Sequence, residues 1–150
     1  MSQSLDQVFV HLIFSTRDRQ PWLDDELRSP LYKYLATVVR KLGCACPRVG
    51  GMADHVHLAI QLSRTMTIAE LVKEIKISSS KWIKSQSPEL TEFSWQKGYG
   101  VFSVGPADLD ALLQYIDQQE EHHKVRLFQD EYRAFLKKYG VVFDERYVWD

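Results

Sequence analysis

The chain has 150 residues, of which 45% are hydrophobic and 26% are charged. This length and composition predict one compact domain over residues 1–150 with a core of its own. The formal net charge is −1, which excludes a uniformly basic surface, so any contact with nucleic acid must come from a local patch. The sequence contains no apolar run long enough to span a bilayer and no signal peptide, so we expect a cytoplasmic protein.

The first half of the chain predicts a strand, a helix and two further strands. The run QVFVHLIFST is rich in β-branched and aromatic residues, which favour a strand. Apolar residues then recur at helical spacing until Gly43, and a Gly50–Gly51 pair predicts a turn between the next two strands. In chain order, these elements are a strand at 7–16, a helix from Asp24 to about Leu42, a short strand at 45–51 and a strand at 53–62.

The second half predicts a helix, a strand and two further helices. Thr67 and Glu70 have the spacing of a capping box at the start of a helix, and Gly140 ends the last helix. These elements are a helix from Thr67 to about Ser85, a strand at 99–105, a helix opened by Pro106, and a helix at 128–139. The order β-α-β-β-α-β predicts an α+β, ferredoxin-like fold, with a four-stranded antiparallel sheet, helices on one face and two further C-terminal helices.

Two cysteines, Cys44 and Cys46, have C-x-C spacing. Zinc ribbons and redox pairs use C-x-x-C, and the sequence has no second cysteine pair. We therefore interpret both as reduced thiols that pack in the ordinary way.

The third predicted strand carries two histidines, His55 and His57, among apolar residues. Residues two apart on a strand point to the same face, so the two imidazoles can converge on one ion or one phosphate. They could equally be two polar residues on a solvated face. A pair of histidines is also an incomplete metal site, because a catalytic ion usually needs a third protein ligand.

The helix after Pro106 offers a nucleophile and a ligand on one face. Tyr115 and Gln119 are four residues apart, and among the seven tyrosines only Tyr115 has a carboxamide at that spacing. His122 continues the same stripe, and His123 lies four residues beyond Gln119. These two histidines could contact phosphate or serve as alternate ligands, although a solvated helix end explains them equally well. His11, on the first strand, is expected near the histidine pair without being a ligand.

The segments ADHVHL and YIDQQEEHHK together resemble the single-tyrosine HUH transposases of insertion sequences and their relatives associated with repetitive extragenic palindromes. The resemblance extends to VFVHLIFSTRDRQPWL, FSWQKGYGVFSV and FLKKYGVVFDERYVWD, and so covers nearly the whole chain. It implies that His55, His57 and Gln119 hold a divalent metal, Mg²⁺ or Mn²⁺, and that Tyr115 attacks a DNA phosphate. The products would be a 5′-phosphotyrosine and a free 3′-hydroxyl that can later be rejoined.

The resemblance also implies single-stranded DNA with hairpin ends as substrate, and a homodimer. Residues expected to contact DNA are basic side chains, several of them on the second helix around Trp82. They are Arg17, Arg19, Arg48, Lys73, Lys76, Lys81, Lys84 and Lys97, with Lys124 as a further candidate. Two other functions fit the same residues. One is a catalytically silent single-stranded or hairpin nucleic-acid binding module, and the other is a metal-dependent phosphodiesterase that uses water as its nucleophile.

Overall fold

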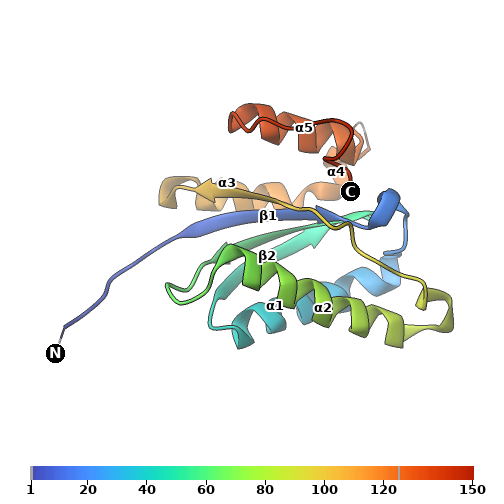
Figure 1. Cartoon of the computed structure of the whole chain (residues 1–150), viewed down its shortest axis with the longest axis horizontal. Helices are drawn as coiled ribbons and strands as arrows, with labels where there is room; N and C mark the ends of the chain where they lie inside the picture. Colours follow the sequence, from blue (N-terminus) through green and yellow to red (C-terminus); the bar gives the residue numbers. More distant parts are fainter. Residues whose placement is uncertain (1, 125) are drawn as a thin grey trace.

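The computed structural model describes residues 2–124 and 126–150 (Figure 1). Its longer elements follow the predicted order, with three short 3₁₀ turns at Arg17–Arg19, Pro88–Leu90 and Pro106–Asp108. The strands and helices are β1 (Phe9–Ser15), α1 (Asp25–Lys41), β2 (Ala45–Gly51), β3 (His55–Gln61), α2 (Ile68–Gln86), β4 (Gly100–Val104), α3 (Leu109–Asp117), α4 (Gln119–His122) and α5 (Phe128–Lys138). No helix within these described residues is long and apolar enough to cross a membrane.

The four strands form one antiparallel sheet in the order β2-β3-β1-β4. This order confirms the ferredoxin-like prediction, in which the first and third strands are central neighbours. In the register of β1 and β3, His57 lies opposite Ile13 and His55 lies opposite Ser15. The histidine pair is therefore at the centre of the sheet, and β4 is an edge strand.

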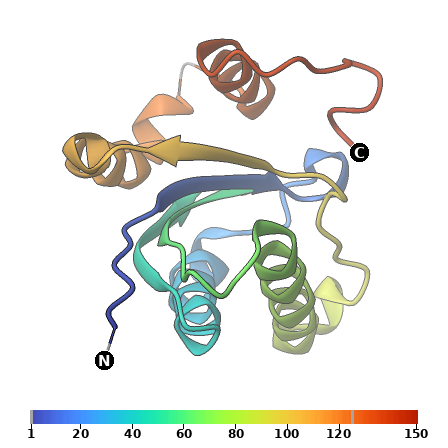
Figure 2. The ribbon, with the colours of Figure 1, turned by 60° about the vertical axis from the view of Figure 1, so that its left-hand side comes forward.

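Helices cover both faces of the sheet. The helices α1 and α2 lie on one face, whereas α3, α4 and α5 lie on the other (Figures 1 and 2). Side chains that alternate along each strand supply a core on each face. Leu12, Phe14 and Leu58 point into the core under α1 and α2. Ile13 points the other way and packs with Phe128, Tyr132 and Leu136 of α5 and Phe102 of β4. His55 and His57 share this second face.

Side chains cap the starts of α1 and α2, and the second of these caps was predicted at Thr67. The Asp24 carboxylate accepts a hydrogen bond from the Leu27 backbone N–H at 2.9 Å, and Thr67 Oγ1 accepts one from the Glu70 backbone N–H at 3.2 Å. Gly43, after α1, and Gly140, after α5, both have positive φ, as expected for residues that end helices. Both cysteines are free thiols.

The prediction of a turn at Gly50–Gly51 is wrong. Both glycines belong to β2, and the chain turns after them, at residues 52–54. Gly50 is needed for a close approach of helix α3: a Cβ atom there would lie 2.7 Å from both Cγ2 and the carbonyl oxygen of Ile116. Because Ile116 follows Tyr115, this contact sets how deeply the tyrosine helix sits on the sheet.

We therefore expect Gly50→Ala to destabilise the fold by about 1–3 kcal/mol, the usual cost of forcing an extra methyl group into a packed contact. The backbone of Ile116 would have to shift, and Tyr115 would move with it. Urea denaturation measures the loss. Gly105→Ala is the control, because its nearest neighbour is the flexible Asp108 carboxylate at 3.3 Å. Equal stability of the two variants would contradict the prediction.

The helix that begins near Pro106 is broken where one helix was predicted. The backbone leaves helical geometry at Gln118, between α3 and α4, so Gln119 begins a new short helix. Backbone hydrogen bonds still bridge the break, from the Gln118 N–H to the Gln114 carbonyl and from the His122 N–H to the Gln118 carbonyl. Tyr115 and Gln119 consequently remain on the same side of the interrupted helix.

Candidate active site

The two histidines of β3 are fully buried, which excludes the alternative of a solvated strand face. Each is oriented through its Nδ1 atom. His55 Nδ1 lies 2.7 Å from the Asp54 carboxylate, and His57 Nδ1 lies 2.7 Å from His11 Nε2. A carboxylate on Nδ1 holds the proton on that side of the ring and leaves Nε2 as the ligand atom. Both Nε2 atoms face the same interior space under α5.

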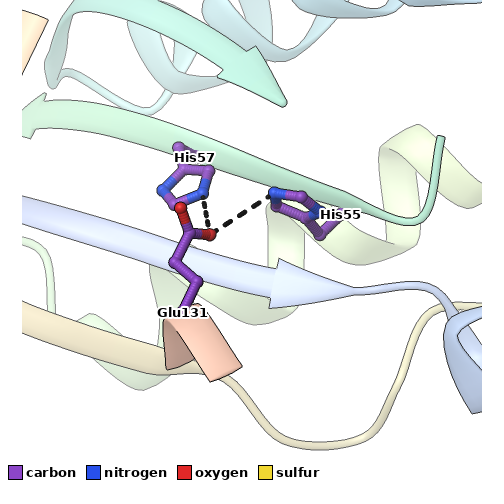
Figure 3. Close-up of side chains that lie close together, drawn as sticks. All are labelled: His55, His57 and Glu131. Atoms are coloured by element: carbon purple, nitrogen blue, oxygen red, sulfur yellow. Dashed lines mark hydrogen bonds and ion pairs between the residues drawn. The ribbon is translucent and has the colours of Figure 1, made fainter. Parts of the chain in front are cut away.

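A glutamate that the sequence reading missed, Glu131 of α5, lies in that space (Figure 3). Its Oε1 atom is 3.0 Å from His57 Nε2 and 3.6 Å from His55 Nε2. Gln119 Oε1 is 2.8 Å from His55 Nε2, and its amide N–H donates to Glu131 Oε2 at 3.0 Å. That bond fixes the orientation of the amide, so its oxygen faces the imidazole.

The sequence did contain a signal for Glu131. It lies within the apolar stripe that α5 presents to the sheet, between Phe128, Tyr132 and Leu136, all of which are buried. A carboxylate on the buried face of an amphipathic helix is costly unless it is paired or binds a metal. Its position in the stripe therefore pointed to a site.

Tyr115 joins this cluster through the same carboxylate. Its hydroxyl donates a hydrogen bond to Glu131 Oε2, and its ring stacks on His122 with centroids 4.5 Å apart. Burial first, and then the charge of Glu131, raise the pKa of Tyr115 well above its ordinary value. The phenol is therefore protonated at neutral pH, and its proton already faces an acceptor.

The electrostatics of the cluster favour an ionised Glu131 carboxylate and neutral imidazoles at His57 and His11. Burial alone raises the pKa of Glu131, but the facing imidazoles of His123 and His57 reverse this, and the net pKa is well below the usual range. Burial lowers the pKa of His57 to about 4 and also lowers that of His11. A neutral imidazole beside an anionic carboxylate is the form in which each binds a metal.

His122 and His123 both lie at the cluster. His123 Nε2 is 3.2 Å from Glu131 Oε1, and its ring lies 4.5 Å from the His55 ring. The Nε2 atoms of His122 and His123 are buried without a well-aligned hydrogen-bond partner among the described residues. The structure thus places both histidines beside the tyrosine and the histidine pair.

The predicted DNA contacts on α2 do not lie near this cluster. Helix α2 covers the opposite face of the sheet (Figure 2). Lys76 donates hydrogen bonds to the backbone carbonyls of Gln96, Lys97 and Gly98, so its ammonium already serves the fold. Trp82 stacks on Tyr34 between α1 and α2, with centroids 5.1 Å apart, instead of offering a free face. Lys73, Lys81 and Lys84 are exposed on that same helix.

The remaining basic candidates lie elsewhere around the sheet. Arg48 of β2 pairs with Asp117 at the end of α3, 3.4 Å away, and so lies beside the tyrosine helix. Arg19 donates to the Trp149 carbonyl at 3.1 Å and holds the C-terminal segment. Arg17 and Lys97 are exposed and line one surface pocket together.

The donor set has the chemistry and spacing of a metal site. Ligand atoms of His55, His57 and Glu131 all lie within 4.8 Å of one another, and Gln119 adds an amide oxygen. Metal–ligand bonds of about 2.0–2.2 Å place neighbouring ligand atoms about 3 Å apart in an octahedral site. The Glu131–His57 separation of 3.0 Å and the Gln119–His55 separation of 2.8 Å are close to this value. Nucleophile and metal donors thus meet at one carboxylate.

Comparison with known proteins identifies the class. The family described as "Transposase IS200 like" matches residues 4–119, and the chain therefore belongs to this family of transposases. It is 25% identical over 120 residues to the ISDra2 transposase TnpA of Deinococcus radiodurans. The aligned region covers 77% of this chain and 86% of that protein.

Solved structures agree with this family. A crystal structure from Deinococcus radiodurans R1, described as a transposase, superposes with a TM-score of 0.62 and 25% identity, and covers 79% of this chain and 98% of that chain. A REP-associated tyrosine transposase bound to a REP hairpin gives a TM-score of 0.59, with coverage of 82% and 74%. Because that pair is only 15% identical, the second likeness shows the fold alone.

Proposed function

We propose that this transposase cuts and rejoins single-stranded DNA, using Tyr115 as nucleophile and a divalent metal held by His55, His57, Gln119 and Glu131. The observation that carries the proposal is the shared carboxylate. One oxygen of Glu131 faces the histidine pair and the other accepts the Tyr115 hydroxyl. A carboxylate shared in this way would hold the nucleophile beside a bound metal, the kind of positioning that phosphoryl transfer requires.

The metal fits these residues by donor type. Two imidazoles, a carboxylate and an amide oxygen suit Mn²⁺, and Mg²⁺ would more naturally take oxygen ligands throughout. When bound there, a divalent ion would supply positive charge to stabilise the phosphate as negative charge develops on it. Asp54 and His11 would keep the two imidazoles in the ligating orientation through their Nδ1 atoms.

One of the protein's own residues accounts for the proton of Tyr115. As the Tyr115 oxygen forms its bond to phosphorus, the hydroxyl becomes a much stronger acid, and its proton passes to Glu131 Oε2, which already accepts that hydrogen bond. The bond from phosphorus to the 3′ oxygen breaks, and that oxygen takes a proton from water to become the 3′-hydroxyl. The reverse steps, with a new 3′-hydroxyl as nucleophile, return the proton to Tyr115 and rejoin the DNA.

The DNA partner follows from the family and the proposed chemistry. One fold neighbour is a transposase bound to a REP hairpin. For this chain we propose single-stranded DNA whose ends form hairpins. Arg48 is the best placed of the basic candidates, because its partner Asp117 ends the tyrosine helix.

The proposed function is tested by incubating the protein and Mn²⁺ with single-stranded oligonucleotides from the DNA that flanks its gene. The expected result is a covalent protein–DNA adduct, seen as a shifted band in a denaturing gel, together with a free 3′-hydroxyl. Binding without cleavage would instead favour a silent binding module. Cleavage without an adduct would favour a phosphodiesterase that uses water.

We also propose that the protein acts as a homodimer through β4. Among the described residues, no strand pairs with the outer side of this edge strand, and pairing of two copies would continue the sheet. The nucleophile and metal donors lie in one chain, so the dimer would serve to bring two DNA ends together and would not be needed to build a site. Sedimentation at micromolar concentration should give the mass of two chains, and a strict monomer would contradict the proposal.

A further inference from the structure

A cavity of about 710 Å³ lies between α3 and α5, above β1 and β4. Its wall includes Tyr115 and the buried His11, so it opens directly beside the proposed nucleophile. Its volume lies in the range of small-molecule sites in proteins, about 300–1,000 Å³. The metal donors His55 and His57 are fully buried, which leaves this cavity as a space from which a substrate can meet Tyr115.

Two aromatic side chains, one from α5 and one from the residue that follows it, form one wall. Phe135 and Tyr139 are one helical turn apart, and both line the cavity. Phe102 of β4 stacks on each of them, with centroids 5.7 Å from Phe135 and 4.7 Å from Tyr139. The two rings are thereby held as a fixed platform, of the kind on which nucleic-acid bases stack.

Groups of opposite charge line opposite sides of the cavity. Lys138 lines it beside Tyr139, is exposed, and has its Nζ atom 5.6 Å from the centre of the Tyr139 ring. Asp108 lies on the α3 side. A phosphate is attracted to the lysine and repelled by the aspartate, which instead can accept hydrogen bonds from a base.

We propose that this cavity holds the nucleoside next to the phosphate that Tyr115 attacks, with its base stacked on Phe135 and Tyr139 and its outer phosphate on Lys138. The inference rests on the proposed function and adds a binding site to it. In-line attack places the phosphorus within about 3–3.5 Å of the tyrosine oxygen, so an adjoining nucleoside must occupy space beside Tyr115. The three residues that carry it lie beyond residue 119, where the family match ends.

The experiment first maps the cleaved bond with the wild-type protein and then places 2-aminopurine on either side of that bond. Binding is followed with Tyr115→Phe protein, so that no chemistry intervenes. Stacking on an aromatic ring quenches 2-aminopurine fluorescence, so we expect quenching at one of the two positions. Adding Tyr139→Ala should relieve the quenching and weaken DNA binding about tenfold, and Tyr139→Trp should restore both. Lys138→Ala should weaken binding with less effect on quenching.

The matched control is Tyr147→Ala, an exposed tyrosine of the C-terminal segment outside the cavity, which should leave both signals unchanged. Unchanged quenching and affinity in both the Tyr139→Ala and Lys138→Ala proteins would overturn the cavity proposal, even if the wild type forms its adduct. Absence of any wild-type adduct would instead refute the proposed function, so the two failures are distinguishable.

Discussion

Tyr115→Phe is expected to abolish the covalent protein–DNA adduct while leaving DNA affinity within about twofold of the wild type. The variant removes the attacking oxygen and keeps the ring that stacks on His122. Loss of a nucleophile removes the covalent route entirely, whereas binding depends mainly on phosphate and base contacts elsewhere. The adduct is scored in denaturing gels and the affinity by fluorescence anisotropy of a labelled oligonucleotide.

The control for this variant is Tyr147→Phe, which removes the hydroxyl of a tyrosine far along the chain and 63% exposed. Its adduct yield should equal that of the wild type. The Tyr115→Phe protein should also bind Mn²⁺ normally, because the hydroxyl is bonded to Glu131 and is not itself among the proposed ligands. An adduct formed by Tyr115→Phe protein would show that another residue is the nucleophile.

The sequence predicted the fold because its local signals agree with its tertiary structure. Strand alternation placed His55 and His57 on one face of a central strand, and the caps at Asp24 and Thr67 set the helix starts. The prediction of a turn at Gly50 was wrong because a glycine can permit either a turn or a close contact. Here the contact with Ile116 decides, and no local pattern reveals a contact with a residue so far along the chain.

The site was predictable to the extent that its residues are close in sequence. The pair His55 and His57 and the pair Tyr115 and Gln119 follow strand and helix spacing, and the structure brings them together. Glu131 reaches them only because the chain folds α5 back over the sheet, and that packing depends on tertiary contacts of Phe128 and Tyr132. The lysines of α2 lie on the other face of the sheet from the cluster, and their charge pattern carries no information on which face their helix covers.

Glu131→Gln is expected to lower Mn²⁺ affinity by at least about tenfold and to reduce adduct formation in parallel. The amide has nearly the shape of the carboxylate and can still accept the Tyr115 hydrogen bond, so the change removes the negative charge that faces His57 and His55 together with the acceptor of the Tyr115 proton. The Mn²⁺ affinity reports on the first of these roles alone. Even residues that only support metal ligands typically cost 10–100-fold in affinity when mutated, and a direct ligand should cost no less. Calorimetric titration with Mn²⁺ measures the affinity without reference to activity.

Asp130→Asn is the matched control for Glu131→Gln. It removes the same charge one residue earlier, from a carboxylate that is exposed and pairs with Arg133 on the surface. Long-range electrostatic effects should be similar in the two variants, so a difference between them belongs to the site. Excess Mn²⁺ should refill the metal site of the Glu131→Gln protein, but the adduct yield should stay below that of the wild type, because the acceptor of the Tyr115 proton is missing. A gain of adduct at unchanged Mn²⁺ affinity would contradict this role, because the carboxylate would then merely occupy the place that the DNA phosphate needs.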